Sequence, residues 1–404
     1  MASVKVQNNS WWGPPRKIGN QLTDRKVSWL ELFFDLVYVI AISTANHYLV
    51  RHQDINGFLD YVYMFTMVYW GWINGSLYYD LHGSPGVRTS LMTLWQMLII
   101  AGMVVTLNIS GENLLFNVTI ALMVMQLYIT YLWWSVGFYD KVHRKLNRPY
   151  TLIYLISLGI LFSTLFSSQP YTRILFYTSL ALNFLPPLVT VWLRRDQAEE
   201  FRLSSSMTER LGLFTIILFG EVIVGVVNGA SAMHAMSWNL WIQFALAISI
   251  VFSLWWIFFG LISDRTCKKG MLNSLLMELV YIPTMMGLGM TGVAFDGLFE
   301  SFQETVTHTG ISFSKGLGYA ESLFLIGIVL LLYFIEYPDP FEKYKSRLQI
   351  VILFGLMLLF SVTYWPFSWS LLQFLIFHLL VLLFMISIIT IAGRQIRRNL
   401  PAED

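Results

Sequence analysis

Trp29-Leu30-Glu31-Leu32-Phe33-Phe34-Asp35-Leu36-Val37-Tyr38-Val39-Ile40 places two carboxylates at the start of a run that is otherwise apolar enough to enter a bilayer. Glu31 and Asp35 are four residues apart, so a helix would carry both on one face. Charged side chains within membrane helices face the protein interior or a water-filled cavity. The stretch therefore predicts a membrane helix with one acidic, inward-facing stripe.

The composition predicts an all-α polytopic membrane protein. Of the 404 residues, 56% are hydrophobic and only 12% are charged, and the mean hydropathy is +0.60. These values exclude an ordinary soluble domain. Cys267 is the single cysteine, which excludes an intramolecular disulfide and a thiolate metal cluster, and we interpret it as an inert loop residue.

Twelve stretches approach the roughly 20 apolar residues that a membrane-spanning helix needs. With both termini cytosolic, every Lys and Arg except Arg51, Arg173 and Lys315 lies in a segment placed on the inner side. We therefore predict a cytosolic tail over 1–28, a twelve-helix transmembrane domain over 29–393 and a cytosolic tail over 394–404. The predicted spans are 29–50, 57–79, 90–108, 113–138, 150–168, 172–193, 209–230, 239–262, 273–295, 319–337, 349–365 and 369–393.

The longest predicted outer loop, 296–318, begins with Asp296, and its Leu298, Phe299 and Phe302 suggest a short surface helix. Asp60 and Glu321 lie near predicted outer ends of their spans, so we interpret both as solvated helix ends. Within the sixth span, a consecutive Pro186-Pro187 pair predicts an interruption of the helix.

An offset of 186 residues aligns Leu32-Phe33-Phe34-Asp35 with Leu218-Phe219-Gly220-Glu221. Because this offset spans six predicted helices, the chain is compatible with two six-helix halves, a layout of several transporter folds. Chance similarity between apolar helices is the alternative.

Asp35, Glu221 and Glu278 lie inside predicted spans, where an ionised carboxylate costs free energy unless it is paired or hydrated. We predict these three acids as candidates for binding a substrate or proton, and a hydrogen-bond hub between helices is the alternative for each. Glu221 is the deepest, about 18 Å from its predicted helix start. Glu31, in contrast, is interpreted as an end-of-helix residue in a Ser28-x-x-Glu31 capping box.

No metal site or cofactor is expected, because the seven histidines show no helical metal-ligand spacing and no Gly-rich phosphate loop occurs. His378 stands alone in an apolar stretch and is interpreted as a core residue. The other polar residues within spans are expected to form interhelical hydrogen bonds, and they include Asn46, His47, Asn74, Gln96, Gln126 and Asn183.

Three segments carry a family resemblance: Ser28-Trp29-Leu30-Glu31-Leu32-Phe33-Phe34-Asp35, Trp70-Gly71-Trp72-Ile73-Asn74, and Thr208-Glu209-Arg210-Leu211-Gly212 continuing to Glu221. With them the chain resembles the bacterial low-temperature-requirement A family. The resemblance implies a multi-helix inner-membrane protein associated by name with growth in the cold. It directs attention to Glu31, Asp35, Asp80, Arg88, Glu209, Arg210 and Glu221.

We expect the charged residues near the cytosolic ends to gather with Glu31 and Asp35 into one cluster, namely Asp80, Arg88, Glu209 and Arg210. In such a cluster the arginines Arg88 and Arg210 favour ionised carboxylates, whereas burial of Glu221 favours its protonated form.

With such opposite environments, one acid can bind a solute or ion while the other takes up and releases a proton. Our leading hypothesis is therefore a proton-coupled transporter of an unidentified small solute or ion. A cation channel is the first alternative, because Phe33-Phe34-Asp35 and the residues after it resemble the first helix of potassium channels with a Phe-Ser-Asp motif. A lipid-binding or lipid-modifying protein is the second, so an enzyme is less favoured but stays open. The expected partners are the lipid bilayer and the solute or ion, not nucleic acid, and a homo-oligomer is left open.

Overall fold

The computed structural model describes residues 15–16, 26–84, 86–108, 114–140, 144–168, 170–193, 199, 201–233, 237–263, 265–302, 313–337, 342, 344–364 and 369–398. Through these ranges the fold is helical, and extended backbone pairs only at an isolated bridge between Cys267 and Ile335. The predicted all-α fold class is confirmed.

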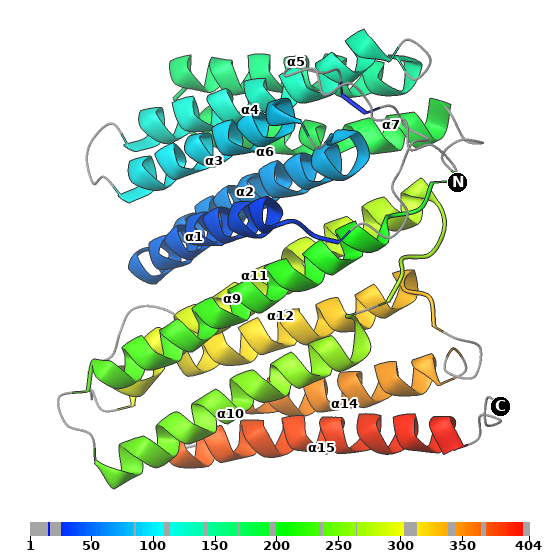
Figure 1. Cartoon of the computed structure of the whole chain (residues 1–404). Coiled ribbons are helices and arrows are strands. Elements are labelled where there is room, and N and C mark those ends of the chain that lie inside the picture. Colours follow the sequence, from blue (N-terminus) through cyan, green and yellow to red (C-terminus); the bar gives the residue numbers. More distant parts are fainter. Residues whose placement is uncertain are drawn as a thin grey trace. The chain divides into compact units, whose positions relative to one another are not determined.

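The helices follow one another along the chain as Figure 1 shows. Their bounds are α1 Trp29–Arg51, α2 Ile55–His82, α3 Val87–Asn108, α4 Leu114–Tyr139, α5 Arg144–Ser163, η1 Thr164–Phe166, α6 Tyr171–Asn183, α7 Leu185–Leu193, α9 Ser205–Ser231, α10 Trp238–Leu261, α11 Met271–Ser301, α12 Phe313–Phe334, α14 Lys345–Tyr364 and α15 Leu371–Arg398.

Each of the twelve predicted spans coincides with a helix, except that the sixth is divided into α6 and α7. The division falls at Phe184, just before Pro186, as the proline pair predicted. Within the described ranges, eleven helical stretches are long and apolar enough to cross a membrane, with α6 and α7 counted as one. The protein is therefore an integral multi-pass membrane protein.

The long helix α2 is not among those eleven. Its Tyr69, Trp70 and Trp72 are almost completely buried, so this helix packs against protein over most of its surface. A helix that lipid does not surround can carry more polar side chains, which accounts for its lower hydropathy.

The chain folds as two units. Unit 1 comprises Met1–Thr44, Tyr63–Glu200 and Ser204–Met207, and unit 2 comprises Ala45–Val62, Phe201–Leu203 and Thr208–Asp404. The last turns of α1 and the first turns of α2 thus belong to unit 2. The predicted duplication of six-helix halves stays a prediction.

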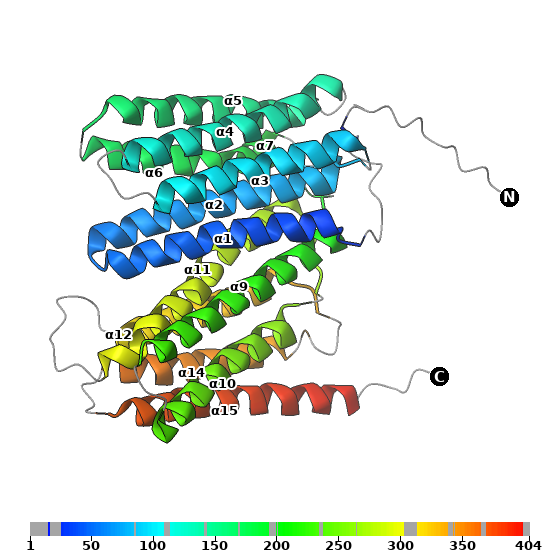
Figure 2. The same ribbon diagram turned by 60° about the vertical axis from the view of Figure 1, so that its left-hand side comes forward.

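In unit 1, α4 packs against α3 and α5, and α5 also packs against α6 (Figure 2). Amides link these helices, as predicted. The side chains of Gln126 and Asn183 exchange two hydrogen bonds of 3.0 and 2.9 Å. Asn74 Oδ1 accepts from Trp133 Nε1 at 3.0 Å and from the Tyr154 hydroxyl at 2.9 Å.

In unit 2, α12 packs against α11 and α14, and α15 packs against α10 and α14. Glycines allow several of these helices to approach closely. A Cβ at Gly287 of α11 would lie 2.6 Å from the backbone nitrogen of Phe324 in α12. A Cβ at Gly225 of α9 would overlap the carbonyl oxygen of Gly292 in α11. Contacts of this kind are typical of membrane helix packing.

Two helix bounds correct the sequence interpretation. Helix α11 continues to Ser301, so Asp296 lies within it, and Leu298 and Phe299 are buried rather than part of a surface helix. Helix α12 begins at Phe313, six residues before the predicted span, so Glu321 lies inside the helix rather than at its end. The remainder of that predicted loop, 303–312, lies outside the described residues.

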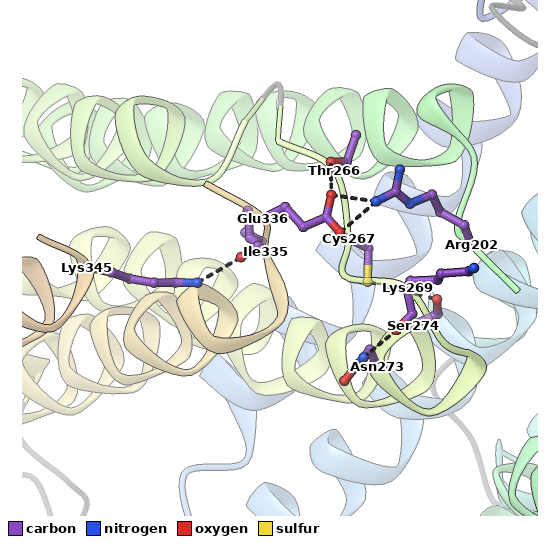
Figure 3. Close-up of polar contacts among 9 residues, drawn as sticks. All are labelled: Arg202, Thr266, Cys267, Lys269, Asn273, Ser274, Ile335, Glu336 and Lys345. Atoms are coloured by element: carbon purple, nitrogen blue, oxygen red, sulfur yellow. Dashed lines mark hydrogen bonds and ion pairs between the residues drawn. The ribbon is translucent and has the colours of Figure 1, made fainter. Parts of the chain in front are cut away.

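Three segments of unit 2 are fastened together in a cluster that we call the clasp, formed by 201–202, 265–270 and 335–336 (Figure 3). Arg202 Nη2 donates to both carboxylate oxygens of Glu336, at 2.6 and 2.5 Å, and Thr266 Oγ1 donates to Oε2 at 3.2 Å. The bridge between Cys267 and Ile335 lies beside this pair. The clasp therefore joins the chain before α9 to the chain after α10 and after α12.

Burial makes the Cys267 thiol of the clasp inert, in agreement with the sequence interpretation. Cys267 is 0% exposed, and burial raises the pKa of its thiol to about 11. Since the thiolate is the nucleophile, we expect a maleimide to label the folded protein at neutral pH at least ten times more slowly than the protein unfolded in SDS. Mass spectrometry of labelled protein measures both rates, with Cys267→Ser as the blank. Equal rates in the two states would contradict this expectation.

Candidate functional site

Asp35 lies on α1 of unit 1 and is completely buried. Its Oδ1 accepts a hydrogen bond of 2.7 Å from the indole Nε1 of Trp72 in α2. Nearby, Gln96 of α3 donates from Nε2 to the Tyr38 hydroxyl at 2.6 Å and to the carbonyl oxygen of Gly71 at 3.0 Å. Asp35 is therefore hydrogen-bonded between α1 and α2, and its role as a hub or as a binding residue stays a prediction.

Glu31 forms the predicted capping box at the start of α1. Its Oε2 accepts from the backbone nitrogen and from the hydroxyl of Ser28, both at 2.8 Å, and Ser28 Oγ accepts from the Glu31 backbone nitrogen at 3.4 Å. This reciprocal arrangement satisfies backbone donors that a helix start leaves without intrahelical partners. Glu31 thus anchors the helix end.

Two other members of the expected charged cluster in unit 1, Asp80 and Arg88, contact hydroxyl groups. Asp80 Oδ2 accepts from the Ser204 hydroxyl at 2.7 Å. Arg88 is buried, donates from Nη2 to Ser135 Oγ at 3.3 Å and lies 5.9 Å from the centre of the Tyr139 ring. Ser135 and the Tyr139 ring thus contact the Arg88 guanidinium, and the expected pairing of Arg88 with a carboxylate stays a prediction.

On α9 of unit 2, the neighbours Glu209 and Arg210 have opposite environments. Glu209 is exposed, whereas Arg210 is only 1% exposed. Adjacent residues of a helix differ by about 100° in direction, so only Arg210 faces the protein. Glu209 therefore lies on the exposed face of α9, and the expected cluster stays a prediction.

Glu221 lines a pocket of unit 2 between α1, α9 and α11. Helix α9 begins four residues earlier than predicted, so Glu221 lies about 24 Å along it and about 15 Å from its other end. The pocket volume is about 20 Å³. The side chains and backbone that line it come from Asn46, His47, Val50, Glu221, Val224, Gly225, Asn228, Gly289, Gly292, Val293 and Asp296.

Sequence reasoning did not bring these residues together. The sequence predicts Asn46 and His47 as interhelical polar residues and places Asp296 in a loop. A signal was present in the spacing, because Glu221, Gly225 and Asn228 lie on one face of a helix at intervals of four and three residues. In contrast, the sequences of α1 and α11 do not indicate which of their faces lie against α9.

Glu278 lies about 10 Å from the start of α11 and is partly exposed. Among the described residues it has no hydrogen-bond or ion-pair partner. It is therefore not part of the pocket around Glu221, although its depth keeps it a candidate for protonation.

Glu321 and His378 correct two sequence interpretations. Both side chains are 0% exposed, and His378 Nδ1 lies 2.7 Å from Glu321 Oε2. Glu321 is thus no solvated helix end, and His378 does not stand alone. Asp60, in contrast, is partly exposed, with the Tyr48 hydroxyl 3.5 Å from its Oδ2.

An aromatic groove lies between α9 and α10 in unit 2. Its volume is about 480 Å³, and its lining is wholly apolar apart from the indole nitrogens. Gly220, which precedes Glu221, opens onto this groove. The lining residues are Ile216, Phe219, Gly220, Ile223, Val251, Phe252, Trp255 and Trp256.

Comparison with known proteins identifies relatives but no function. The chain is 24% identical to an uncharacterized protein of Rhizobium meliloti (strain 1021) over 277 residues, which is 65% of this chain and 64% of that protein. The match thus spans less than two thirds of the relative's length. No solved structure matches the chain. Residues 26–389 match the model of the bacterial low temperature requirement A protein family, and the chain therefore belongs to that family.

Proposed function

We propose that the protein is a membrane transporter in which Glu221 binds a proton or a small cation. The observation that carries this proposal is the pocket around Glu221, which brings a carboxylate deep within the helices together with a second carboxylate, Asp296. Carboxylates within membrane spans mark ion pathways and proton relays in many transport proteins.

The size of the pocket favours an ion over an organic solute. A volume of about 20 Å³ holds about one water molecule, whereas pockets for small organic ligands have volumes of roughly 300–1,000 Å³. The lining contains the acids Glu221 and Asp296 and the amides Asn46 and Asn228, but neither Lys nor Arg. Oxygen-rich surroundings of this kind suit a proton or a cation.

The helix contacts support a site that responds to helix movement. Gly225 lies one turn after Glu221 and contacts Gly292 of α11 through backbone atoms. The Glu221 carboxylate is thus held where two helix backbones meet. A small shift between α9 and α11 changes the pocket directly, and alternating access requires such shifts.

The predicted topology determines on which side of the membrane the pocket lies. With both termini cytosolic, the ends of α1, α9 and α11 that contribute His47, Asn228 and Asp296 lie on the outer side of a bacterial inner membrane. The proton or cation then enters the site from outside. A role in growth at low temperature, which the family's description suggests, belongs to this proposal.

Flux measurements in liposomes test the role of Glu221. We expect purified protein to carry protons or Na⁺ down an imposed gradient, followed with a pH-sensitive or Na⁺-sensitive dye inside the vesicles. Glu221→Gln removes the titratable group with little change in shape, and we expect it to lower the flux at least tenfold. Glu209→Gln, which changes an exposed acid on the same helix, is the matched control.

Wild-type flux in Glu221→Gln, or in Glu221→Gln combined with Asp35→Asn, would contradict the proposed mechanism. Unitary currents in planar bilayers would instead assign the pocket to a cation channel, because channel currents far exceed the turnover of a carrier. A strain that lacks the protein should grow poorly in the cold, and only the wild-type and Glu209→Gln proteins should restore growth.

The groove between α9 and α10 favours lipid binding as a second candidate function. Its volume of about 480 Å³ and its aromatic lining, with Trp255 and Trp256, suit an isoprenoid or an acyl chain. Lipid retained through purification, identified by mass spectrometry and lost in Trp256→Ala, would support this function.

A further inference from the structure

Glu321 of α12 and His378 of α15 form a buried acid–base pair that the pocket around Glu221 does not use. The two side chains are 0% exposed and 2.7 Å apart. Glu321 Oε1 and His378 Nε2, the other polar atoms of the pair, are also buried and have no hydrogen-bond partner among the described residues. Each side chain therefore keeps one atom that can still bind a proton or accept a hydrogen bond.

The pair lies within membrane-spanning helices. Glu321 is about 12 Å and His378 about 10 Å from the start of its helix. Aromatic rings enclose the imidazole, since Phe374 lies 4.3 Å and Phe377 lies 6.3 Å from it, measured between ring centres. Water therefore contributes little to the solvation of any charge on the pair.

Among the described residues, no other charged side chain contacts the pair. Helix α10 carries no titratable side chain. Gly287, the residue of α11 that contacts α12 at Ala320 and Phe324, is nine residues from both Glu278 and Asp296, or about 14 Å along the helix. The titratable residues of α14, namely Lys345, Arg347 and Tyr364, also have no interaction with Glu321 or His378 in the described ranges.

The net charge of the pair depends on how many protons the two side chains bind. A glutamate anion next to a neutral imidazole has a net charge of −1, which is costly in a low-dielectric interior. One more proton, on either the carboxylate or the imidazole, makes the pair neutral overall. A metal ion is a poorer occupant, because the described residues bring no group of three His, Cys, Asp or Glu side chains together.

We propose that Glu321 and His378 form a proton-binding site, separate from Glu221, that takes up and releases one proton between α12 and α15. Proton uptake converts the carboxylate to the acid or the imidazole to the imidazolium and changes no other bond. Release leaves a buried negative charge, so it favours separation of the pair or entry of water. The site thereby couples proton exchange to the contact between α12 and α15.

Nitrogen NMR of the histidine side chains tests this proposal in the full-length protein in nanodiscs. The His378 signals are identified by their absence in His378→Gln. We expect them to change over a range of pH, because the pair gains or loses one proton. In Glu321→Gln, which keeps a hydrogen-bonding group of the same shape, we expect the midpoint to move by at least about one pH unit. Glu221→Gln is the matched control and should leave the midpoint unchanged.

His378 signals that stay constant over this range in the wild-type protein would overturn the proposal, since the pair would then be a fixed hydrogen bond. An unchanged midpoint in Glu321→Gln would overturn it as well. The wild-type titration needs no variant, so the test stands even if a substitution prevents folding. It is also independent of flux through Glu221, so failure of the transport assay leaves its outcome unaffected.

Discussion

Gly225→Ala will destabilise the protein by about 1–3 kcal/mol, the usual cost of overpacking a well-packed core. The new Cβ would overlap the carbonyl oxygen of Gly292, a backbone atom that cannot turn aside as a flexible side chain can. Helices α9 and α11 must therefore separate, and their neighbouring contacts weaken. A larger side chain, as in Gly225→Leu, should prevent assembly of unit 2.

Unfolding of the purified protein in mixed micelles with increasing SDS measures this effect. Gly220→Ala is the matched control on the same helix, because its Cβ would meet nothing within 4 Å. That change should be neutral or stabilise the protein by up to about 1 kcal/mol, since alanine favours the helix over glycine. Similar unfolding curves for the two variants would show that α9 and α11 do not approach closely at Gly225.

Trp72→Phe will cost about 2–3 kcal/mol of stability. The substitution removes the indole donor that lies 2.7 Å from Asp35 Oδ1, and removing one partner of a buried polar group costs roughly 1–3 kcal/mol. The loss is large because the Asp35 carboxylate is fully buried and water cannot replace the donor. The smaller phenyl ring also leaves unfilled space.

Asp35→Asn is the matched variant, because its amide oxygen still accepts from Trp72. We expect it to lose less than half as much stability as Trp72→Phe in the same SDS titration. If instead Asp35→Asn is the more destabilised protein, the carboxylate charge matters more than the hydrogen bond. Asp35 would then have a function beyond joining α1 to α2.

The membrane spans were predictable because their signal is local. An apolar run of about 20 residues and the placement of Lys and Arg each follow from the energetics of single helices in a bilayer. The capping box of Ser28 and Glu31 was predictable for the same reason, since its partners are three residues apart. Even α2, which lipid does not surround, kept enough apolar residues to be recognised.

The candidate sites were harder to predict because their partners are distant in sequence. Glu321 and His378 are 57 residues apart, and each is surrounded along the chain by apolar residues that give no sign of a partner. An error of six residues in the start of α12 also moved Glu321 from the interior to a helix end. In the same way, an early end for α11 placed Asp296 in a loop and hid its position beside Glu221.

The clasp holds several helices of unit 2 together at one end. It fixes the chain next to the start of α9, the start of α11 and the end of α12 at one end of the helices, through Arg202, Cys267 and Glu336. If the helices tilt about this end, their far ends move most, and a tilt of about 5° displaces a side chain 24 Å away by about 2 Å, as much as the helix shifts of known switches. Glu221 lies about 24 Å from the start of α9, so a tilt of that size moves the residues that line its pocket by about the diameter of an atom.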